Sequence, residues 1–318
     1  MRAIILAVLL CLCVPVSRAA GIRFVQVPAD ANGPALKAVV WTPCASVAHQ
    51  LSIGPYLLKA NRDCPTMGTS LPLIVISHGH GGTFLNHHDL AETLADAGFV
   101  VAAIDHPGDT LADMSLAADL SSFVERPTDI KRLIDYMLGA ASDSSRINPA
   151  SIGFFGFSRG GYTGLVLAGG NPDFLNANVP CPDSTLPICD QLRRKQIPLQ
   201  PLTHDPRIKA YVIADPVDEF PTATSLKDVK APIQLWVSQY GGDGVLPETG
   251  MDLANALPQR PDFHPVPDSA HFAFLAPCPP ELLKNTPGIC VDEKGFDRTA
   301  FHAEMNRQAL RFFQSRLQ

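Results

Sequence analysis

The chain has 318 residues, of which 46% are hydrophobic, 18% charged and 7% aromatic. This length and apolar content allow a large buried core and exclude a collagen-like or low-complexity protein. With 25 basic and 31 acidic side chains, the net charge is −6. An acidic chain without a basic run is a poor candidate for binding nucleic acid or an anionic membrane surface.

The N-terminus has the three-part pattern of an export signal. Arg2 supplies a positive charge, residues 3–16 are apolar but too short to span a bilayer, and Ser17-Arg18-Ala19 offers small residues for cleavage after Ala19. We predict a cleaved signal peptide over residues 1–19, with an N-terminal membrane anchor as the alternative. The mature chain would carry 23 basic and 31 acidic side chains, a net charge of −8, and would be periplasmic or secreted without a stable membrane anchor.

Strands and helices alternate along the rest of the chain. Apolar or alternating runs predict strands, and apolar residues at helical spacing predict helices. In chain order we expect strands 22–27 and 36–41, a surface loop over 45–70, strand 71–77, helix 87–97, strand 99–104, helix 126–138, strand 151–157, helix 161–168, strands 208–213 and 233–237, and helix 296–317.

This alternation predicts an α/β fold, with a mostly parallel sheet and helices on both of its faces. The sequence has no internal repeat and no linker, so residues 20–318 are predicted to form a single domain. The one large insertion, at about residues 171–206, is rich in proline and contains two cysteines.

Six cysteines lie outside the predicted signal peptide, an even number that indicates disulfides in an oxidising compartment. They fall into three local pairs, and we predict the disulfides Cys44–Cys64, Cys181–Cys189 and Cys278–Cys290. Each would contribute about 2–3 kcal/mol by restricting the unfolded chain. A zinc site needs closely paired ligands such as Cys-x2-Cys, which this sequence does not contain.

The first candidate site is the turn Gly156-Phe157-Ser158-Arg159-Gly160, between a predicted buried strand and a helix. The Gly-x-Ser-x-Gly pattern is weak by itself, but a nucleophile elbow requires this strand–turn–helix context. The glycines lack a Cβ, so strand and helix can pass close to the serine. We therefore predict that Ser158 is a nucleophile beside a helix N-terminus, which favours negative charge. The alternative is an ordinary glycine-rich turn.

A second glycine-rich turn, Ser77-His78-Gly79-His80-Gly81-Gly82, follows the strand 71–77. Gly-x-Ser-x-Gly sites combine the N–H after the nucleophile with one from such an earlier loop. The predicted oxyanion-hole donors are therefore the backbone N–H groups of His80 and Arg159. The competing prediction is a metallohydrolase site made by His78, His80, His87 and His88. A helix rarely turns two consecutive residues inward, so we expect His87 and His88 to be solvated and no metal to be bound.

A serine hydroxyl is a weak nucleophile at neutral pH and needs an adjacent base. His271, in a late turn, is the candidate because it gives the chain order Ser…Asp…His that accompanies Gly-x-Ser-x-Gly. His106, at the end of the strand 99–104, is expected to line the substrate pocket. For Phe272 and Phe274, beside His271, pocket lining and core packing are the two alternatives.

Two aspartates are candidates for the acid that orients His271. Asp243 follows the strand 233–237 and is our first choice. Asp215 follows the strand 208–213 and is the alternative. The aspartate that does not contact His271 is expected to have a structural role, such as capping a turn or helix.

Together, these motifs resemble a known family. The segments SHGHGG, AIDHPGD, GFSRGGYTGLVLAGG, GGDGVLP and SAHFAF resemble the α/β-hydrolase superfamily, and within it the predicted dienelactone hydrolases related to platelet-activating-factor acetylhydrolases. The resemblance covers most of residues 22–318. It implies an eight-stranded sheet and a serine carboxylic-ester hydrolase without metal or cofactor.

The resemblance assigns the same roles as the residue analysis, with Ser158 as nucleophile, His271 as base and the N–H groups of His80 and Arg159 as oxyanion hole. It is divided on the acid. The pattern around Asp243 fits the general superfamily, while the acetylhydrolases take their acid from the earlier strand, where Asp215 lies. The dienelactone hydrolases proper use a cysteine nucleophile, so the serine at position 158 argues against dienelactone as substrate.

The sequence thus predicts an exported serine esterase that forms an acyl-enzyme on short- to medium-chain esters, including lipid or polyester-like ones. The insertion 171–206, stiffened by Cys181–Cys189, is expected to wall the acyl pocket. A peptidase or amidase would use the same catalytic residues and stays open as the alternative.

Overall fold

The computed structural model describes residues 19–177, 179, 181 and 185–318. The predicted signal peptide lies outside the described residues except for Ala19, which begins strand β1 (Ala19–Val27) and pairs with Cys44 at the end of β2 (Leu36–Cys44). In the described part of the chain, no helix is long and apolar enough to cross a membrane. The division into a signal peptide and one domain stays a prediction.

The described strands form one ten-stranded sheet in the order β10-β9-β8-β7-β5-β6-β2-β1-β4-β3. Neighbours from β10 to β6 are parallel, as are β1 and β4, whereas the other pairs are antiparallel. The remaining strands are β3 (His49–Ile53), β4 (Tyr56–Arg62), β5 (Leu71–Ser77), β6 (Val100–Ile104), β7 (Ile147–Phe157), β8 (Ile208–Ala214), β9 (Ile233–Ser238) and β10 (Asp262–Val266). The mostly parallel sheet is confirmed, but it has ten strands and not eight.

The expected loop over residues 45–70 contains a hairpin, so that prediction is wrong. β3 and β4 are antiparallel and turn at Gly54, where φ is 54°. Burial alternates along the first five residues of β4, as expected for a strand with one face toward the core. Both strands carry polar residues, which hides the alternation of buried and exposed positions in the sequence.

The sequence analysis does not predict β10, because this strand contains Pro265. Proline is tolerated in β10 because the strand lies at the edge of the sheet.

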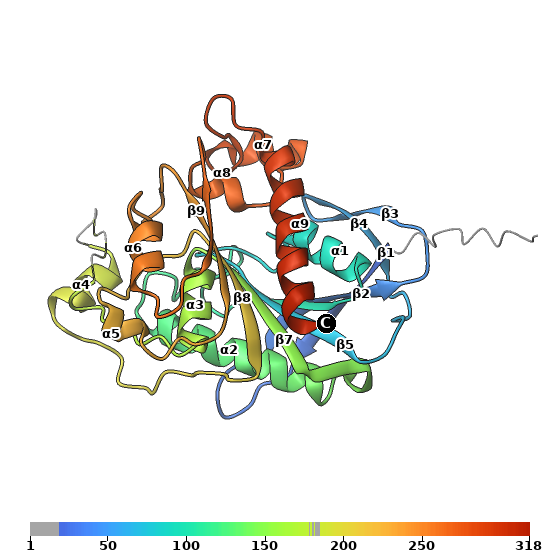
Figure 1. Cartoon of the computed structure of the whole chain (residues 1–318), viewed down its shortest axis with the longest axis horizontal. Helices are drawn as coiled ribbons and strands as arrows, with labels where there is room; N and C mark the ends of the chain where they lie inside the picture. The colour runs from blue at the N-terminus through green and yellow to red at the C-terminus, as the bar shows by residue number, and fades with distance from the viewer. Residues whose placement is uncertain (1–18, 178, 180, 182–184) are drawn as a thin grey trace, which may run out of the picture.

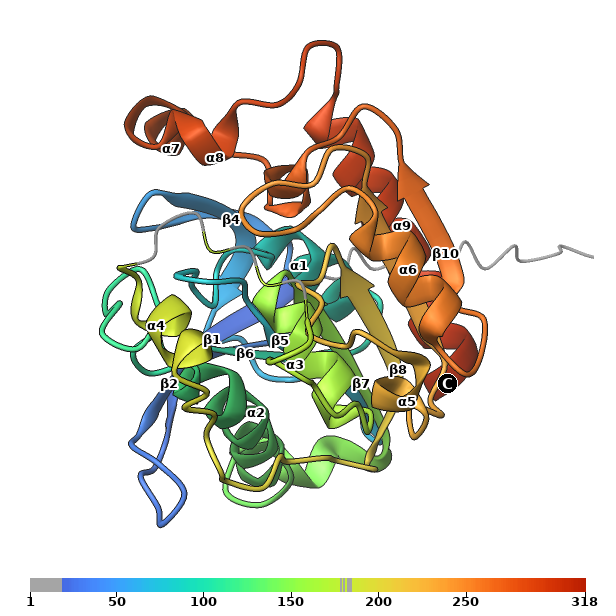
Figure 2. The same ribbon diagram turned by 90° about the vertical axis from the view of Figure 1, so that its left-hand side faces the viewer.

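Helices cover both faces of the sheet (Figures 1 and 2). α1 (His88–Asp96) and α9 (Arg298–Leu317) pack their apolar side chains against one face. α2 (Ser121–Leu138), α3 (Arg159–Leu167) and α6 (Thr249–Ala256) pack against the other. Because both faces are covered, every residue of β5 and β6 is buried, which explains their continuous apolar sequences.

Short helices lie in the connections between these elements. They are η1 (Ser144–Arg146), α4 (Pro187–Arg193), α5 (Ala223–Leu226), η2 (His271–Phe274), α7 (Pro280–Asn285) and α8 (Pro287–Cys290). The predicted helix 126–138 corresponds to α2, which begins five residues earlier, at Ser121. The other predicted elements match observed ones within a few residues.

All three predicted disulfides are confirmed. Cys44–Cys64, Cys181–Cys189 and Cys278–Cys290 have Cα–Cα distances of 6.0, 5.8 and 5.7 Å. Cys44–Cys64 joins the end of β2 to the residues after β4, and Cys278–Cys290 encloses α7 and most of α8. Three disulfides in one chain are typical of proteins from an oxidising compartment.

Candidate active site

Ser158 lies in the turn between β7 and α3, at the carboxyl end of β7, with φ of 56° and ψ of −120°. This backbone conformation is unfavourable for a serine and requires support from the surrounding structure. A Cβ on Gly156 would lie 2.2 Å from the Gly160 carbonyl oxygen, and one on Gly160 would lie 2.0 Å from the Ser77 carbonyl oxygen. Both glycines are therefore needed for β7, α3 and the end of β5 to meet around Ser158.

His271 connects Ser158 to Asp215. Its Nε2 lies 3.0 Å from Ser158 Oγ, and its Nδ1 lies 2.6 Å from Asp215 Oδ2. All three side chains are buried, with exposed fractions of 2% or less. Phe157 stacks on the imidazole at a centroid distance of 4.6 Å and restricts the orientation of the ring. The arrangement can hold one imidazole tautomer and move a proton away from the serine hydroxyl.

Of the two candidate acids, Asp215 contacts His271 and Asp243 does not. Asp243, our first choice, is therefore wrong as the acid, and Asp215, the alternative, takes that position. Asp215 directly follows β8, and its carboxylate also accepts hydrogen bonds from the N–H and Oγ of Ser238, at 2.7 and 2.9 Å. Asp243 is exposed, in the loop beyond β9. That loop supports His271 through its backbone, because the Gly241 carbonyl accepts from the His271 N–H at 2.8 Å.

The two predicted oxyanion donors belong to turns that meet at Ser158. Arg159 is the first residue of α3, so its N–H has no carbonyl partner within the helix. His80 lies in a turn closed by the Gly82 N–H and the Gly79 carbonyl, in which Gly81 has φ of 58°. A Cβ on Gly79 would lie 3.2 Å from Ser158 Cβ, so this turn touches the serine. The roles of both N–H groups stay predictions.

A cavity of about 310 Å³ borders Ser158, His271 and His80. Its other lining side chains are mostly apolar and are Leu111, Phe157, Phe272, Leu275, Leu282 and Ile289, with Tyr56, Thr83, Asn86, Asp243 and Thr286 as polar members. Phe272 therefore lines the cavity, whereas Phe274 is fully buried in the core.

The described residues of the insertion 171–206 contribute nothing to this lining, contrary to expectation. The wall comes instead from Leu282, Thr286 and Ile289, between Cys278 and Cys290. The insertion packs elsewhere: the N–H of Ile188, in α4, donates to the carbonyl of Ala118, before α2. The wall is therefore formed by the shorter segment 278–290 and not by the longer insertion 171–206.

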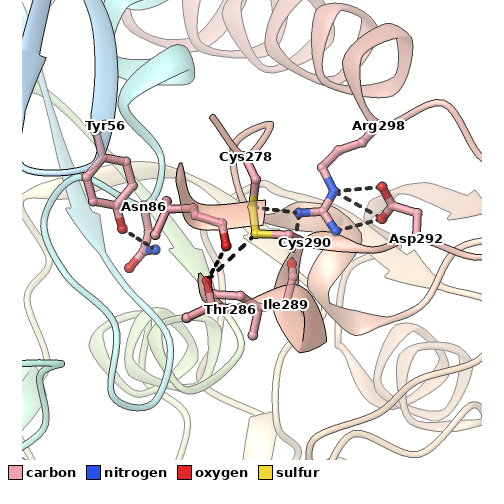
Figure 3. Close-up of a disulfide and its surroundings, with 9 residues drawn as sticks. Tyr56, Asn86, Cys278, Thr286, Ile289, Cys290, Asp292 and Arg298 are labelled. Atoms are coloured by element: carbon pink, nitrogen blue, oxygen red, sulfur yellow. Dashed lines mark hydrogen bonds and ion pairs between the residues drawn. A yellow bond between two sulfur atoms is a disulfide. The ribbon is translucent and has the colours of Figure 1, made fainter. Parts of the chain in front are cut away.

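Figure 3 shows how the segment 278–290, which we call the disulfide-closed wall, is held. Arg298 donates to the Ile289 carbonyl at 3.0 Å and pairs with Asp292 at 2.7 Å. Thr286 Oγ1 lies 3.9 Å from Cys290 Sγ. The disulfide thus joins the two ends of the wall, and a largely buried ion pair between Asp292 and Arg298, the first residue of α9, lies next to its C-terminal end.

His106 does not line the cavity, so its predicted pocket role is wrong. It is fully buried, with Nε2 2.9 Å from Ser77 Oγ and Nδ1 3.0 Å from Asp129 Oδ2. A buried imidazole needs hydrogen-bond partners for its ring nitrogens, and the end of β5 and helix α2 supply them. Burial lowers the pKa of His106 well below its ordinary value, so the ring is neutral.

His87 and His88 are buried, so the prediction that they are solvated is wrong. His88 contacts Glu92 at 3.1 Å, and His87 packs edge-on against Phe155 and Phe157. Burial lowers the pKa of His87 to about 3. His87 is buried against β7 and His88 beside Tyr56 of β4, on the face of the sheet that α9 also covers. Among the described residues, no group of three or more His, Cys, Asp or Glu side chains converges as a metal site would require.

Sequence reasoning also missed Asp109, the last residue of the AIDHPGD segment. It is fully buried and contacts both turns that carry the predicted oxyanion donors. Its place in the loop after the buried strand β6, at the carboxyl edge of the sheet, is the sequence feature that indicates a role near the site.

The chain is similar to hydrolases in each comparison with known proteins. The family described as serine aminopeptidase, S33, matches residues 69–181. NocK of Nocardia uniformis subsp. tsuyamanensis, which carries the name of an esterase, is 28% identical over 176 residues, which span 52% of this chain and 46% of that relative. Less than half of the length of that relative is therefore matched.

Two solved structures are similar over nearly the whole chain. A ferulic acid esterase from Streptomyces cinnamoneus has a TM-score of 0.65 at 17% identity, and the match covers 96% of this chain and 91% of the esterase. A dienelactone hydrolase from Anabaena variabilis has a TM-score of 0.54 at 17% identity, covering 94% and 99%. The predicted α/β-hydrolase fold is confirmed.

Proposed function

We propose that this protein is a serine carboxylic-ester hydrolase that works through an acyl-enzyme intermediate. The observation that carries the proposal is the continuous chain of contacts from Asp215 through His271 to Ser158, next to an apolar cavity. Such a chain activates a serine that is otherwise a weak nucleophile. The names of the similar proteins support an ester as the substrate. NocK and the structural neighbour from Streptomyces cinnamoneus are named esterases, and the other structural neighbour is named a dienelactone hydrolase.

In the proposed reaction, Ser158 Oγ attacks the ester carbonyl carbon while His271 Nε2 takes the hydroxyl proton. The N–H groups of His80 and Arg159 stabilise the negative charge on the carbonyl oxygen. The bond to the alcohol oxygen then breaks, and His271 gives the proton to the leaving alcohol. Water, activated by His271, attacks the acyl-enzyme in the same way, and the carboxylic acid leaves.

The cavity supports substrates with a small apolar acyl or aryl group. Its volume of about 310 Å³ is at the low end for small-molecule sites. Leu111, Phe272, Leu282 and Ile289 offer apolar contact to that group. The proposal includes lipid or polyester-like esters whose group on the other side of the scissile bond extends outside the cavity.

A peptidase or amidase is the second candidate. The matching family is described as a serine aminopeptidase, and Asp243 is the one carboxylate in the described cavity lining. A carboxylate there would pair with a free ammonium group of a substrate. Comparing an ester with the amide of the same acyl group separates the two activities, and we expect the ester to react faster.

We also propose that the protein is exported to the periplasm or the medium. The three disulfides support this, because such bonds persist in oxidising compartments. N-terminal sequencing of the protein recovered outside the cytoplasm tests the proposed cleavage after Ala19. Recovery of the uncleaved chain in the cytoplasm alone would contradict export.

The test of the activity compares wild type and Ser158→Ala on nitrophenyl esters from acetyl to dodecanoyl. We expect kcat/KM to fall by about 10³-fold or more, because only binding and the oxyanion hole remain in the variant. Ser225→Ala, a change of a buried serine on α5, is the matched control and should retain activity. A Ser158→Ala variant that hydrolyses these esters at the wild-type rate would contradict the mechanism.

A further inference from the structure

A buried cluster of charged side chains lies directly beneath the candidate oxyanion hole. We define it as the Asp109 clamp, made by Asp109, Arg126 and Arg159. Asp109 is fully buried in the loop after β6, and Arg126, on α2, has an exposed fraction of 1%. Arg126 Nη1 and Arg159 Nη1 both donate to Asp109 Oδ2, at 2.6 and 2.8 Å. Two helices are thus joined through one carboxylate oxygen.

The other oxygen of the same carboxylate reaches the first turn. Asp109 Oδ1 accepts from the Gly81 N–H at 2.8 Å, in the peptide unit directly after His80. Arg126 contacts this turn from its other end, because Nη2 donates to the His78 carbonyl. His78 and Gly81, which flank Gly79 and His80 in the chain, are therefore both held by the clamp.

The second turn is held through Arg159. This residue follows Ser158, so its backbone N–H is one candidate donor while its side chain is bound by the clamp. The guanidinium also donates to the Ala117 carbonyl and to Ser122 Oγ, and it stacks over Phe123 at 4.5 Å. Its position is thus defined by several contacts, of which only Asp109 also reaches the first turn.

We infer that Asp109 is a positioning residue for the oxyanion hole, which it assembles by fixing the turn of His80 and the start of α3 relative to each other. The inference rests on the proposed function, because the donors matter only if a carbonyl oxygen gains charge there. Asp109 touches neither Ser158 nor the substrate cavity, so its effect on the reaction is indirect.

The electrostatics of the clamp support a permanently ionised carboxylate. Burial alone would raise the pKa of Asp109, but Arg126 and Arg159 outweigh it and lower the pKa to about 2. An ionised acceptor makes shorter and stronger hydrogen bonds than a neutral one. Preorganised donors need this rigidity, since a displacement of about 1 Å can cost about 10²-fold in rate.

The test is Asp109→Asn, which keeps an oxygen for the Gly81 N–H and turns an NH2 group toward the arginines, so that it accepts from neither of them. We expect kcat on a reactive nitrophenyl ester to fall about 10- to 100-fold with KM within about 3-fold of wild type, as for a loss confined to the transition state. A fluorophosphonate that labels Ser158 gives a second readout. The rate of labelling should fall with kcat, while the final extent should match wild type.

The matched control is Asp129→Asn, a buried carboxylate of α2 that contacts His106 and neither turn. It should keep kcat and the labelling rate within about 3-fold of wild type at temperatures where it is folded. If Asp109→Asn does not fold, Arg159→Met takes its place, since it keeps the backbone N–H and removes the guanidinium. The same kcat loss at nearly constant KM is then expected.

Three results would overturn the inference, and they are distinguishable. An active wild type with unchanged kcat and labelling rate in the clamp variant would refute the positioning role alone. A kcat loss that Asp129→Asn reproduces would equally refute it, because the effect would then be one of general stability. A wild type that hydrolyses no ester and is not labelled would refute the proposed function and the inference with it.

Discussion

Asp215 and Asp243 share an unusual backbone conformation but lie in different surroundings. Both have positive φ, 43° and 47°, which asparagine and aspartate tolerate better than most residues. Asp215 is buried against His271 and Ser238, whereas Asp243 is exposed on the cavity. An Asp→Asn change at each position is therefore a matched pair that differs in contact with His271.

We expect Asp215→Asn to lower kcat by about 10³- to 10⁴-fold, because the amide favours the wrong imidazole tautomer and cannot stabilise the imidazolium. Asp243→Asn should change kcat by less than about 3-fold. Steady-state kinetics on one nitrophenyl ester measure both. The reverse order of effects would show that Asp243 moves to His271 in the working enzyme and would contradict the assignment.

Among the elements, the disulfide-closed wall supplies one side of the cavity through Leu282, Thr286 and Ile289. It carries α7 and α8, which are too short to be stable helices on their own. Leu282 and Ile289 contribute apolar surface to the cavity, and the wall is fixed by Cys278–Cys290 and Arg298. The preference for acyl length should therefore depend on this disulfide.

We expect the double variant Cys278→Ser/Cys290→Ser to lose about 10-fold in kcat/KM for hexanoyl esters relative to acetyl esters, because the apolar wall is no longer fixed against the longer chain. Cys181→Ser/Cys189→Ser is the control. It opens a loop of similar length, so its loss of stability should be comparable, about 2–3 kcal/mol. Equal effects of both double variants on the ester preference would contradict the role of the wall.

At the scale of the whole molecule, the buried carboxyl group of Glu219 makes the stability of the fold depend on pH. Glu219 has an exposed fraction of 5%, and its Oε2 has no hydrogen-bond partner among the described residues. Burial, with a smaller contribution from Asp218, raises the pKa of Glu219 to about 7. Between its unfolded pKa and about 7, the folded state binds more protons, so this group destabilises the fold as pH rises through that range.

Replacing Glu219 by glutamine should therefore raise the thermal midpoint by a few degrees at about pH 8 and have little effect at about pH 5. Glu248→Gln, the same change at an exposed site, should have little effect at either pH. Thermal denaturation of the three proteins measures this. A gain of Glu219→Gln that is larger at pH 5 than at pH 8 would contradict the direction of the pKa shift.

Several features of the site could be predicted from local sequence. A Cβ on the glycines around Ser158 would come as close as 2.0 Å to neighbouring backbone atoms, so only glycine fits there. The glycine pattern after a buried strand therefore predicts the elbow from local sequence. The disulfides were predicted correctly because each pair is local. The histidines His87, His88 and His106 were misplaced, because burial depends on which helix or strand end covers a residue and not on its neighbours in the chain.

By itself the sequence determined the mostly parallel α/β sheet, the three disulfides and the identity of the turns that carry Ser158 and His271. These follow from short-range patterns: apolar periodicity, glycine where backbones must touch and cysteines near each other. Only the tertiary structure decided that Asp215 contacts His271, that residues 278–290 wall the cavity, and that Asp109 joins two turns. The contacts of Asp215 with His271 and of Asp109 with the two turns join residues at least 28 positions apart along the chain, and their distances depend on how the strands and loops pack together. Spacing along the chain does not encode that packing.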